Sequence, residues 1–398
     1  MYVLRNYQKE AIKKGCDFFD SSSKKRPVIV LPTGAGKSIV IAHISKHVGN
    51  VIVLQPTAEL LEQNYQKYQE TIKGHPDLPN AAKYSASVGV KEKANVTFAT
   101  IGSVYKKPEY FVEFPYAIVD ECHNVPPKKK SMYTQFFSAI NSRVLGLTAT
   151  PFRNKKYIDP FSGERYTQVN LLNREVPKFF NEFLYIVQMK ELVDMGYLCP
   201  INYIKMKWDG SFLRFNTTGA EYDETSVREA LKQNQIIEKI PGILRQAFEK
   251  GQKSCLVFVN SVNEAKRLSE EVADSAYVHA LAKKAERKKA IEDFKKGKIK
   301  VMFNVSVLNE GFDYPELDTI IIARPTASLT LYTQIIGRGM RNAPGKQKCS
   351  VVDLCGNLDR FGRLEDISLV KDENHGWILR TPNKILSGRP IKKIAGMT

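Results

Sequence analysis

The apolar positions of the N-terminal half form short runs separated by longer mixed segments. The runs are rich in β-branched residues and end at glycine, proline or polar residues, which is typical of buried strands. They cover residues 28–31, 51–54, 96–99, 117–119 and 144–147. Helical patterns, such as residues 58–68, fit between several of them. This alternation predicts a mainly parallel sheet that is covered by helices on both faces.

The second half repeats the alternation after two interruptions, at residues 152–185 and 207–226. Further strands are expected at residues 255–259, 301–303, 319–322 and 350–352. The pattern therefore predicts an α/β protein with one domain at residues 1–190, a second at 191–365 and a basic tail at 366–398. We expect residues 152–185 to be an irregular connector packed on the first domain; a strand-separating or duplex-tracking element is the alternative.

Composition narrows the class of protein. Of the 398 residues, 43% are hydrophobic and 26% charged, which excludes a wholly disordered chain. No apolar run reaches the length of about 18 residues that a membrane-spanning helix needs, so no membrane association is expected. Residues 1–8 lack the basic-then-apolar pattern of a secretory signal. The six cysteines include no C-x-x-C pair, so we expect buried, reduced thiols in the cytoplasm of a bacterium or a phage-infected cell.

Charge points to a polyanionic partner. Sixty basic and 42 acidic residues give a net charge of +18. The basic excess is concentrated at residues 128–130, 283–300 and 377–398. A solvated helix face is the usual explanation of the segment 283–300 and a phosphate-contacting face is the alternative, so charge alone does not identify nucleic acid as the partner.

A glycine-rich loop follows the first predicted strand and precedes a helix. Small residues let backbone N–H groups surround phosphate oxygens, and the helix N-terminus adds the positive end of its dipole. Lys37 is expected to bind the β- and γ-phosphates, and Ser38 to ligate Mg²⁺. Leu31 stands where the strict motif has its first glycine, so the match is to a Pro-Thr-Gly-x-Gly-Lys-Ser variant. The predicted nucleotide-binding loop comprises Pro32, Thr33, Gly34, Ala35, Gly36, Lys37 and Ser38.

Two adjacent carboxylates follow the predicted strand at 117–119. Asp120 can reach a Mg²⁺ held by Ser38. Glu121 beside it can polarise the attacking water. Together with the loop, these residues predict Mg²⁺-dependent hydrolysis of a nucleoside triphosphate.

Asp120-Glu121-Cys122-His123 resembles a DEAD/DEAH-type box, and with the loop at 32–38 the chain resembles helicase superfamily 2. Cys122 replaces the alanine that is common at this position of the box, with little expected effect on hydrolysis. Other motifs follow in the order expected for this superfamily: the Q-type motif at 4–8, Ia at 55–60, Ib at 100–103, III at 147–151, IV at 257–261, V at 304–315 and VI at 334–341. The resemblance covers roughly residues 1–365 and looks closest to RadD-like repair helicases, with UvsW-like phage helicases more distant.

The resemblance implies two RecA-like domains with ATP bound in the cleft between them. Arg338 and Arg341 would act as arginine fingers. Gln334 and His123 would couple the state of ATP to domain position. Four further residues are expected to bind the nucleotide: Arg5 and Gln8, where Gln8 would contact the adenine edge, and Gly311 and Asp313, where Asp313 would contact the ribose.

The same resemblance places nucleic acid across both domains. The candidate contacts are mostly small polar residues near strand ends, suited to phosphate oxygens, so little sequence specificity is expected. They are Pro56, Thr57, Thr100, Ser103, Asn260, Ser261 and Asn304.

The favoured function is an ATP-dependent helicase or translocase acting on single-stranded, forked or branched DNA of repair and recombination. We expect a monomer with repair or replication proteins as partners. An RNA helicase and a non-hydrolysing nucleic-acid-binding scaffold are the alternatives. A further alternative is the motor subunit of a restriction enzyme. It lacks support, because the sequence shows no convincing carboxylate–lysine nuclease motif.

Overall fold

The structure is a computed structural model that describes residues 3–74, 77–307, 312–388 and 390–391. The chain divides into two compact units. The first unit contains residues 1–153 and 170–188, and the second contains residues 154–169 and 189–398.

The first unit is built on an eight-stranded sheet in the order β10-β1-β7-β6-β2-β5-β3-β4. Neighbouring strands run parallel except for the β3–β4 pair. All residues of β2 and β5 are buried, as expected for strands with helices on both sides. The strands are β1 (Pro27–Val30), β2 (Val51–Gln55), β3 (Ala81–Ser85), β4 (Val90–Lys91), β5 (Val96–Thr100), β6 (Tyr116–Val119), β7 (Arg143–Thr148) and β10 (Glu182–Ile186).

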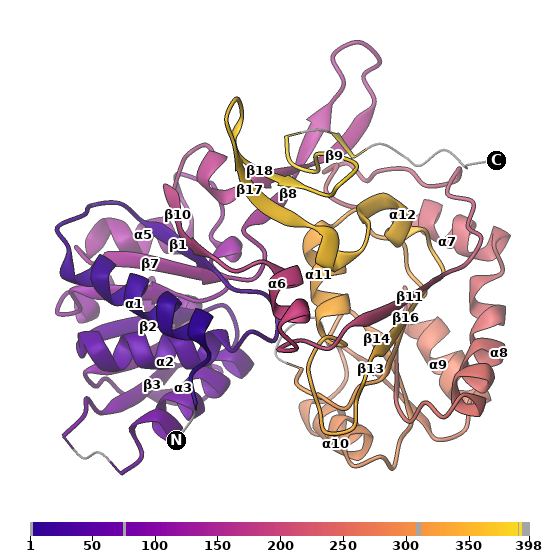
Figure 1. Cartoon of the computed structure of the whole chain (residues 1–398), viewed down its shortest axis with the longest axis horizontal. Coiled ribbons are helices and arrows are strands. Elements are labelled where there is room, and N and C mark those ends of the chain that lie inside the picture. Colours follow the sequence, from indigo (N-terminus) through magenta and orange to yellow (C-terminus); the bar gives the residue numbers. More distant parts are fainter. Residues whose placement is uncertain (1–2, 75–76, 308–311, 389, 392–398) are drawn as a thin grey trace. The chain divides into compact units, whose positions relative to one another are not determined.

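The helices of this unit cover both faces of the sheet. From β1 through β2 to β3 the chain moves one way across the sheet, and from β5 through β6 to β7 it returns. Right-handed crossovers therefore put α2 and α3 on one face and α4 and α5 on the other. Figure 1 shows α2 and α3 in front of the sheet and α5 behind it. The helices are α1 (Asn6–Asp20), α2 (Lys37–Val48), α3 (Ala58–Ile72), α4 (Ile101–Val104) and α5 (Met132–Ala139), with short 3₁₀ turns η1 (Pro108–Phe111), η2 (Cys122–Asn124) and η3 (Leu172–Arg174).

The second unit contains a six-stranded, all-parallel sheet in the order β11-β16-β15-β12-β14-β13. Its strands are β11 (Ile201–Lys205), β12 (Cys255–Phe258), β13 (Ser275–His279), β14 (Val301–Val305), β15 (Thr319–Ile322) and β16 (Cys349–Asp353). Its helices are α6 (Met189–Asp194), α7 (Glu224–Gln233), α8 (Ile236–Glu249), α9 (Val262–Glu271), α10 (Lys284–Lys295), α11 (Leu329–Gly337) and α12 (Asn357–Phe361), followed by the turn η4 (Leu364–Asp366).

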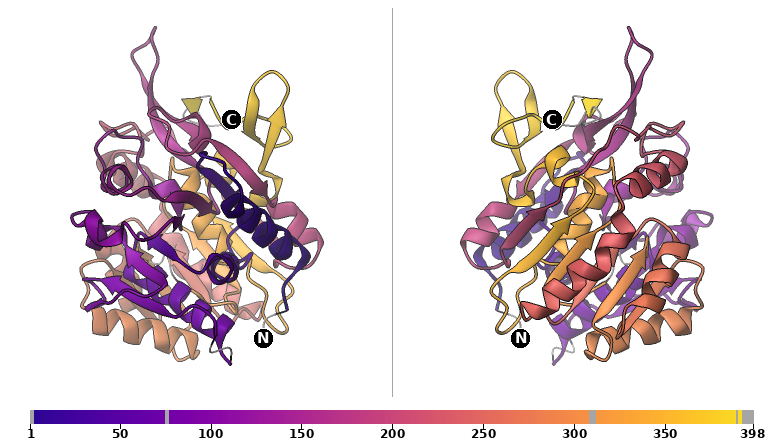
Figure 2. Two further views of the ribbon diagram at one scale, coloured as in Figure 1. Left: turned by 90° about the vertical axis from the view of Figure 1, so that its left-hand side faces the viewer. Right: turned by 90° about the vertical axis from the view of Figure 1, so that its right-hand side faces the viewer.

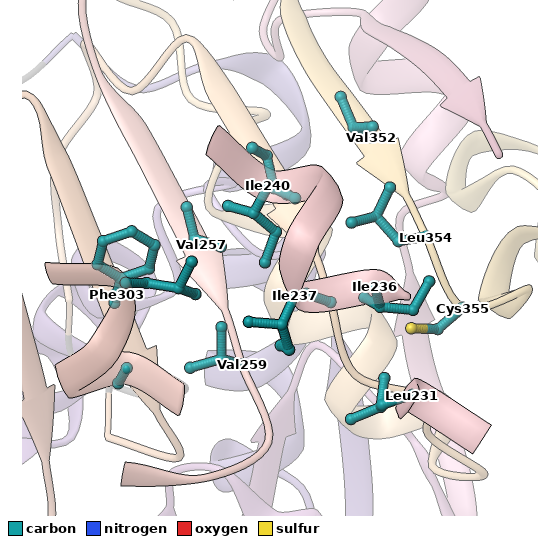
Figure 3. Packing of buried hydrophobic residues seen from close by; sticks show 14 of the residues in the cluster. Leu231, Ile236, Ile237, Ile240, Val257, Val259, Phe303, Val352, Leu354 and Cys355 are labelled. Carbon is teal, nitrogen blue, oxygen red and sulfur yellow. The ribbon is translucent and has the colours of Figure 1, made fainter. Parts of the chain in front are cut away.

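A continuous apolar core joins one face of this sheet to α7, α8 and α9. In Figure 3, Ile237 and Ile240 of α8 lie on the side of Val257 and Val259, and Ile236 lies beside Leu354 and Cys355. This packing orders the strand ends that carry the polar motif residues. The mainly parallel α/β architecture predicted from the hydrophobic pattern is confirmed in both units.

The segment 152–185 differs from the irregular connector that we expected. It contains the hairpin β8 (Phe152–Ile158) and β9 (Arg165–Leu171), and it ends in β10 of the first sheet. Residues 154–169 belong to the second unit and not to the first. The loop of the hairpin extends away from the sheet of that unit (Figures 1 and 2). The alternating pattern is confined to β9, where every second residue from Thr167 is buried, and only Val169 and Leu171 of these are apolar, so the pattern is weak in the sequence.

The predicted tail also contains regular structure. Strands β17 (Ser368–Asp372) and β18 (Gly376–Arg380) form an antiparallel hairpin, and β19 (Pro390–Ile391) pairs with β9. Residues 392–398 lie outside the described part.

The six cysteines are free and buried, as predicted. Burial raises the pKa of the Cys255 thiol to about 12, so the reactive thiolate is disfavoured. None of the helices in the described residues is long and apolar enough to cross a membrane.

We predict that Ile240→Ala destabilises the second unit by about 2–5 kcal/mol, because it leaves a cavity at a fully buried position of α8. Urea unfolding followed by circular dichroism measures the loss. Leu281→Ala, at a side chain that is 91% exposed, is the matched control and should change stability by less than about 0.5 kcal/mol. Equal effects of the two substitutions would contradict this description of the core.

Candidate functional site

The glycine-rich loop joins β1 to α2 and has a backbone that only small residues adopt easily. Gly34 and Gly36 have φ angles of +84° and +81°. Gly36 is the N-cap of α2 and provides no side-chain cap. The first backbone N–H groups of α2 therefore lack the capping partner that most helices supply from a side chain. Such N–H groups can bind an anion at this end of the helix.

Lys37, at the start of α2, forms ion pairs with both predicted carboxylates. Its Nζ lies 2.9 Å from Asp120 Oδ1 and also contacts Glu121 Oε1. Burial favours the neutral amine, yet the two carboxylates outweigh it and raise the pKa of Lys37 well above its ordinary value. The structure thus brings together the lysine and the acidic pair that the sequence predicted.

Glu121 remains charged for the converse reason. Burial acts to raise its pKa, but Lys37 and His123 hold the pKa of Glu121 well below its usual range. Lys37, Asp120 and Glu121 by themselves, one ammonium and two carboxylates, leave an excess of one negative charge in a mostly buried cluster. Such a cluster favours an additional cation.

His123 connects the acidic box to the end of β7. Its Nδ1 lies 2.8 Å from Thr148 Oγ1 and 3.3 Å from Glu121 Oε2. Thr148 Oγ1 also accepts a hydrogen bond from the backbone N–H of Thr150, and its carbonyl accepts one from the N–H of Leu31. A change at the acidic box can therefore reach the loop and the segment after β7 through direct contacts.

The N-terminal motif braces the loop from α1. The Gln8 side-chain amide donates to the carbonyl of Ala35 (2.9 Å), and Tyr7 Oη donates to the same carbonyl (2.9 Å). Gln8 Oε1 accepts from the backbone N–H of Arg5. Both polar ends of the buried Gln8 side chain thus have partners in the protein, and its predicted contact with adenine stays a prediction.

The predicted arginine fingers belong to the second unit. Arg338 Nη1 and Arg341 Nη1 both donate to the carbonyl of Phe312, at 2.5 and 2.9 Å. Arg341 also pairs with Asp313 (2.6 Å). Asp313, which we predicted to contact the ribose, therefore holds one of the two arginines in this structure.

Lys346 supports this arrangement and was not predicted. Its Nζ donates to the carbonyls of Pro315, Gly339 and Arg341, at 2.8–2.9 Å. Burial lowers the pKa of Lys346. The segment that carries both arginines is thereby tied to the segment after Asp313. Gln334, which was predicted to couple the state of ATP to domain position, lies half-buried on α11. Gly311, which was predicted to bind the nucleotide, lies outside the described residues.

The candidate nucleic-acid contacts of the first unit have roles within the protein. Thr57, preceded by half-buried Pro56, caps α3 by accepting from the N–H of Leu60. Thr100 Oγ1 is hydrogen-bonded to the Ser103 hydroxyl (2.9 Å) and is buried. Their predicted contacts with phosphate stay predictions.

The candidate nucleic-acid contacts of the second unit also have hydrogen-bond partners within the protein. Ser261 caps α9, and the backbone N–H groups of Asn260 and Ser261 both donate to Glu264 Oε2. Asn304 is fully buried, and its side-chain oxygen accepts from the N–H of Val307. Their contacts with phosphate also stay predictions.

Sequence reasoning missed Asn64, which donates from Nδ2 to Asp120 Oδ2 at 2.7 Å. The buried face of α3 otherwise consists of Leu60, Leu61 and Tyr68. A polar residue on an otherwise largely apolar helix face is the signal that could have identified it.

Among the described residues there is no group of three or more His, Cys, Asp or Glu side chains that could hold a metal ion. Asp120 with Ser38 could ligate Mg²⁺ only together with other ligands. Mg²⁺ commonly completes its shell with phosphate oxygens and water, so the residues present fit a metal that enters with a nucleotide.

Two family descriptions match the chain. Residues 1–153 match "Type III restriction enzyme, res subunit", and residues 235–343 match "Helicase conserved C-terminal domain".

Curated relatives are similar over nearly the whole chain. A Schizosaccharomyces pombe protein named as a candidate mitochondrial ATP-dependent helicase, irc3, is 26% identical over 99% of this chain and 64% of its own length. The IRC3 helicase candidate of Saccharomyces cerevisiae is 24% identical over 89% of this chain and 52% of its own. The DNA 3'-5' translocase XPB2 of Sulfurisphaera tokodaii is 26% identical over 85% of this chain and 78% of its own length. The chain thus spans about half to two-thirds of the length of the first two relatives.

Solved structures share the fold. A fragment of a type I restriction enzyme HsdR subunit from Vibrio vulnificus superposes with a TM-score of 0.66 at 20% identity, covering 95% of this chain and 70% of that one. The restriction-modification enzyme LlaBIII bound to DNA superposes with a TM-score of 0.64 at 16% identity, and the match covers 89% of this chain and 28% of that one. Dbp5 of S. cerevisiae bound to RNA and ADP BeF3 superposes with a TM-score of 0.54 at 17% identity, and the match covers 88% of this chain and 83% of that one. At these identities the likeness shows the fold alone.

We predict that Gly36→Ala weakens nucleotide binding and destabilises the protein more than Gly74→Ala does. Both glycines have φ +81°, so each substitution costs about 1–2 kcal/mol in backbone strain. A Cβ at Gly36 would in addition lie 2.5 Å from Gln8 Nε2, whereas none of the described atoms lies within 4 Å at Gly74.

Urea unfolding and titration with a fluorescent ATP analogue separate these effects. Loss of the Gln8–Ala35 hydrogen bond should add about 1 kcal/mol to the cost of Gly36→Ala. If both variants lose equal stability and bind the analogue equally, the bracing of the loop by Gln8 has no energetic importance.

Proposed function

Because the chain belongs to helicase superfamily 2, we propose that it hydrolyses Mg²⁺-bound ATP and uses the energy to move along DNA. The observation that carries the proposal is the cluster of Lys37 with Asp120 and Glu121 beside an uncapped helix N-terminus. A lysine, two carboxylates and a loop of small residues are the groups that phosphoryl transfer requires.

Each residue of this cluster has a definite part in the proposal. Lys37 binds phosphate oxygens and gives up its pairing with the carboxylates when a nucleotide enters. Ser38 and Asp120 hold Mg²⁺, which supplies positive charge to the phosphates when bound. Glu121, whose pKa is held low, stays ionised at neutral pH and can orient and polarise the attacking water.

Arg338 and Arg341 complete the proposed chemistry by stabilising charge on the transferred phosphoryl group. Their shared acceptor, the carbonyl of Phe312, sets both guanidinium groups in one place before nucleotide binds. Preorganised cations need little rearrangement during the reaction, which is where electrostatic catalysis gains its advantage. Gln334 and His123 are proposed to link this step to movement of the units.

Two observations favour a nucleic acid as partner, and a third favours DNA as the polymer. The net charge of +18 suits a polyanion. Lys128, Lys129 and Lys130 are exposed, as is most of α10. The S. tokodaii relative is named as a DNA translocase. We propose forked or branched repair intermediates as substrates and a monomer as the acting form, in the cytoplasm of a bacterium or phage-infected cell.

The β8–β9 hairpin is proposed to contact the nucleic acid at a fork. The side chain of Phe161, in its loop, is 98% exposed. Asp159 Oδ1 accepts from the backbone N–H groups of Phe161 and Ser162, at 2.9 and 3.0 Å, so the loop has a defined conformation. Exposed Lys155 and Lys156 on β8 add positive charge. An exposed aromatic ring on a loop of defined backbone conformation can stack on a terminal base pair.

We predict that Lys37→Ala lowers ATP turnover by about 10²–10³-fold, because it removes a preorganised positive charge at the phosphates. ATPase assays without polymer and with single-stranded DNA, forked DNA and RNA measure the loss and identify the stimulating polymer. Nucleic-acid binding should change little. Lys46→Ala, in the last turn of the same helix, is the control and should keep full turnover.

Unchanged turnover in Lys37→Ala would refute the site assignment. Stimulation by RNA alone would support the RNA helicase, and a wild-type protein without ATPase activity would support the scaffold. The retained Lys37, Asp120, Glu121, Arg338 and Arg341 argue against a scaffold.

We predict that Phe161→Ala reduces strand displacement on forked DNA about tenfold and leaves DNA-stimulated ATP hydrolysis intact, since one base–aromatic stack contributes about 1–3 kcal/mol. Phe161→Trp should retain displacement, and Leu281→Ala tests whether loss of any exposed apolar side chain has the same effect. Normal displacement by Phe161→Ala would show that the hairpin does not separate strands.

A further inference from the structure

Asn64 occupies a position where an amide is costly. It lies on the buried face of α3 and is only 1% exposed. An asparagine side chain has two donor hydrogens and an acceptor oxygen. Its Nδ2 donates to Asp120, while among the described residues Oδ1 has no hydrogen-bond partner. Leaving a buried polar atom unpaired costs about 1–3 kcal/mol, so an apolar residue would serve packing better here.

The hydrogen bond to Asp120 gives this amide a use. Asp120 is also 1% exposed, and its two oxygens face different partners. Oδ1 lies 2.9 Å from Lys37 Nζ and accepts the N–H of Glu121 at 2.9 Å. Oδ2 accepts the amide of Asn64 at 2.7 Å. With one oxygen held by Asn64, the plane of the carboxylate is set and the other oxygen points toward Lys37.

We propose that Asn64 is a positioning residue that fixes the carboxylate of Asp120 for binding of Mg²⁺ with the nucleotide. The inference rests on the proposed function, because it takes Asp120 as a metal ligand. The Asn64 contact is on the oxygen that faces away from Lys37, so it persists when Lys37 moves to the phosphates. Groups that hydrogen-bond to a metal ligand hold its orientation in this way.

Charge also favours the amide over the alternatives at this position. The cluster already carries two carboxylates against one ammonium. A cationic donor at position 64 would neutralise the excess negative charge that attracts Mg²⁺. A neutral donor orients Asp120 and leaves that charge in place.

The test compares Asn64→Leu with the wild type and with Gln69→Leu, the same change of amide to leucine elsewhere on α3. Binding of a fluorescent, slowly hydrolysed ATP analogue is measured with Mg²⁺ and with EDTA. Urea unfolding without ligand confirms that each variant folds. We expect Asn64→Leu to weaken binding in Mg²⁺ by about 10–100-fold, the usual effect of losing such a partner of a metal ligand. Binding in EDTA should hardly change, and Gln69→Leu should bind like the wild type in both conditions.

The possible results distinguish a failure of the role proposed for Asn64 from a failure of the proposed ATPase function. If Asn64→Leu binds the Mg²⁺ complex as tightly as the wild type does, or loses affinity equally in Mg²⁺ and EDTA, Asn64 does not position the metal ligand. In either case the proposed ATPase stands as long as Lys37→Ala remains defective. If the wild-type protein itself binds the analogue no better with Mg²⁺ than with EDTA, the metal site of the proposed function is wrong.

Discussion

The ion pairs of Lys37 with Asp120 and Glu121 are the interaction around which the candidate site of the first unit is organised. Buried charges cost several kcal/mol each unless they are paired and hydrogen-bonded. The surrounding contacts meet this requirement, because His123 contacts Glu121 and Asn64 donates to Asp120. The cluster stays one positive charge short of neutrality, so the same packing that supports the fold leaves it suited to a cation.

A second constraint recurs in both units: a backbone carbonyl accepts hydrogen bonds from two side chains. Ala35 O receives Tyr7 and Gln8, and Phe312 O receives Arg338 and Arg341. Two donors on one acceptor fix the position of that carbonyl in each unit. In the first unit this holds the loop that is proposed to bind phosphate, and in the second unit it brings two guanidinium groups together.

The residues that escaped prediction share a cause. Asn64 contacts Asp120 and Lys346 contacts the carbonyl of Pro315, so both act on segments far from their own in sequence, and neither lies in a recognisable motif. The β8–β9 hairpin was missed because its strands are half-exposed and mostly polar. Its assignment to the second unit depends on packing contacts, including the pairing of β9 with β19. Thr57 and Ser261 illustrate the converse: predicted from motifs for one role, they also cap helices.

The sequence alone determined the α/β class, most of the sheet strands and the loop of small residues ending in Lys37, because these depend on local hydrophobic periodicity and on residue types with few conformational alternatives. It also assigned Lys37 and the carboxylates that follow β6 to one site, because a carboxylate at the end of that strand can reach a Mg²⁺ held by Ser38. Tertiary structure decided which oxygen of Asp120 faces Lys37, which donors hold Ala35 and Phe312, and where residues 154–169 pack. These contacts depend on side chains that converge from distant segments of the chain, and no local sequence pattern encodes such convergence.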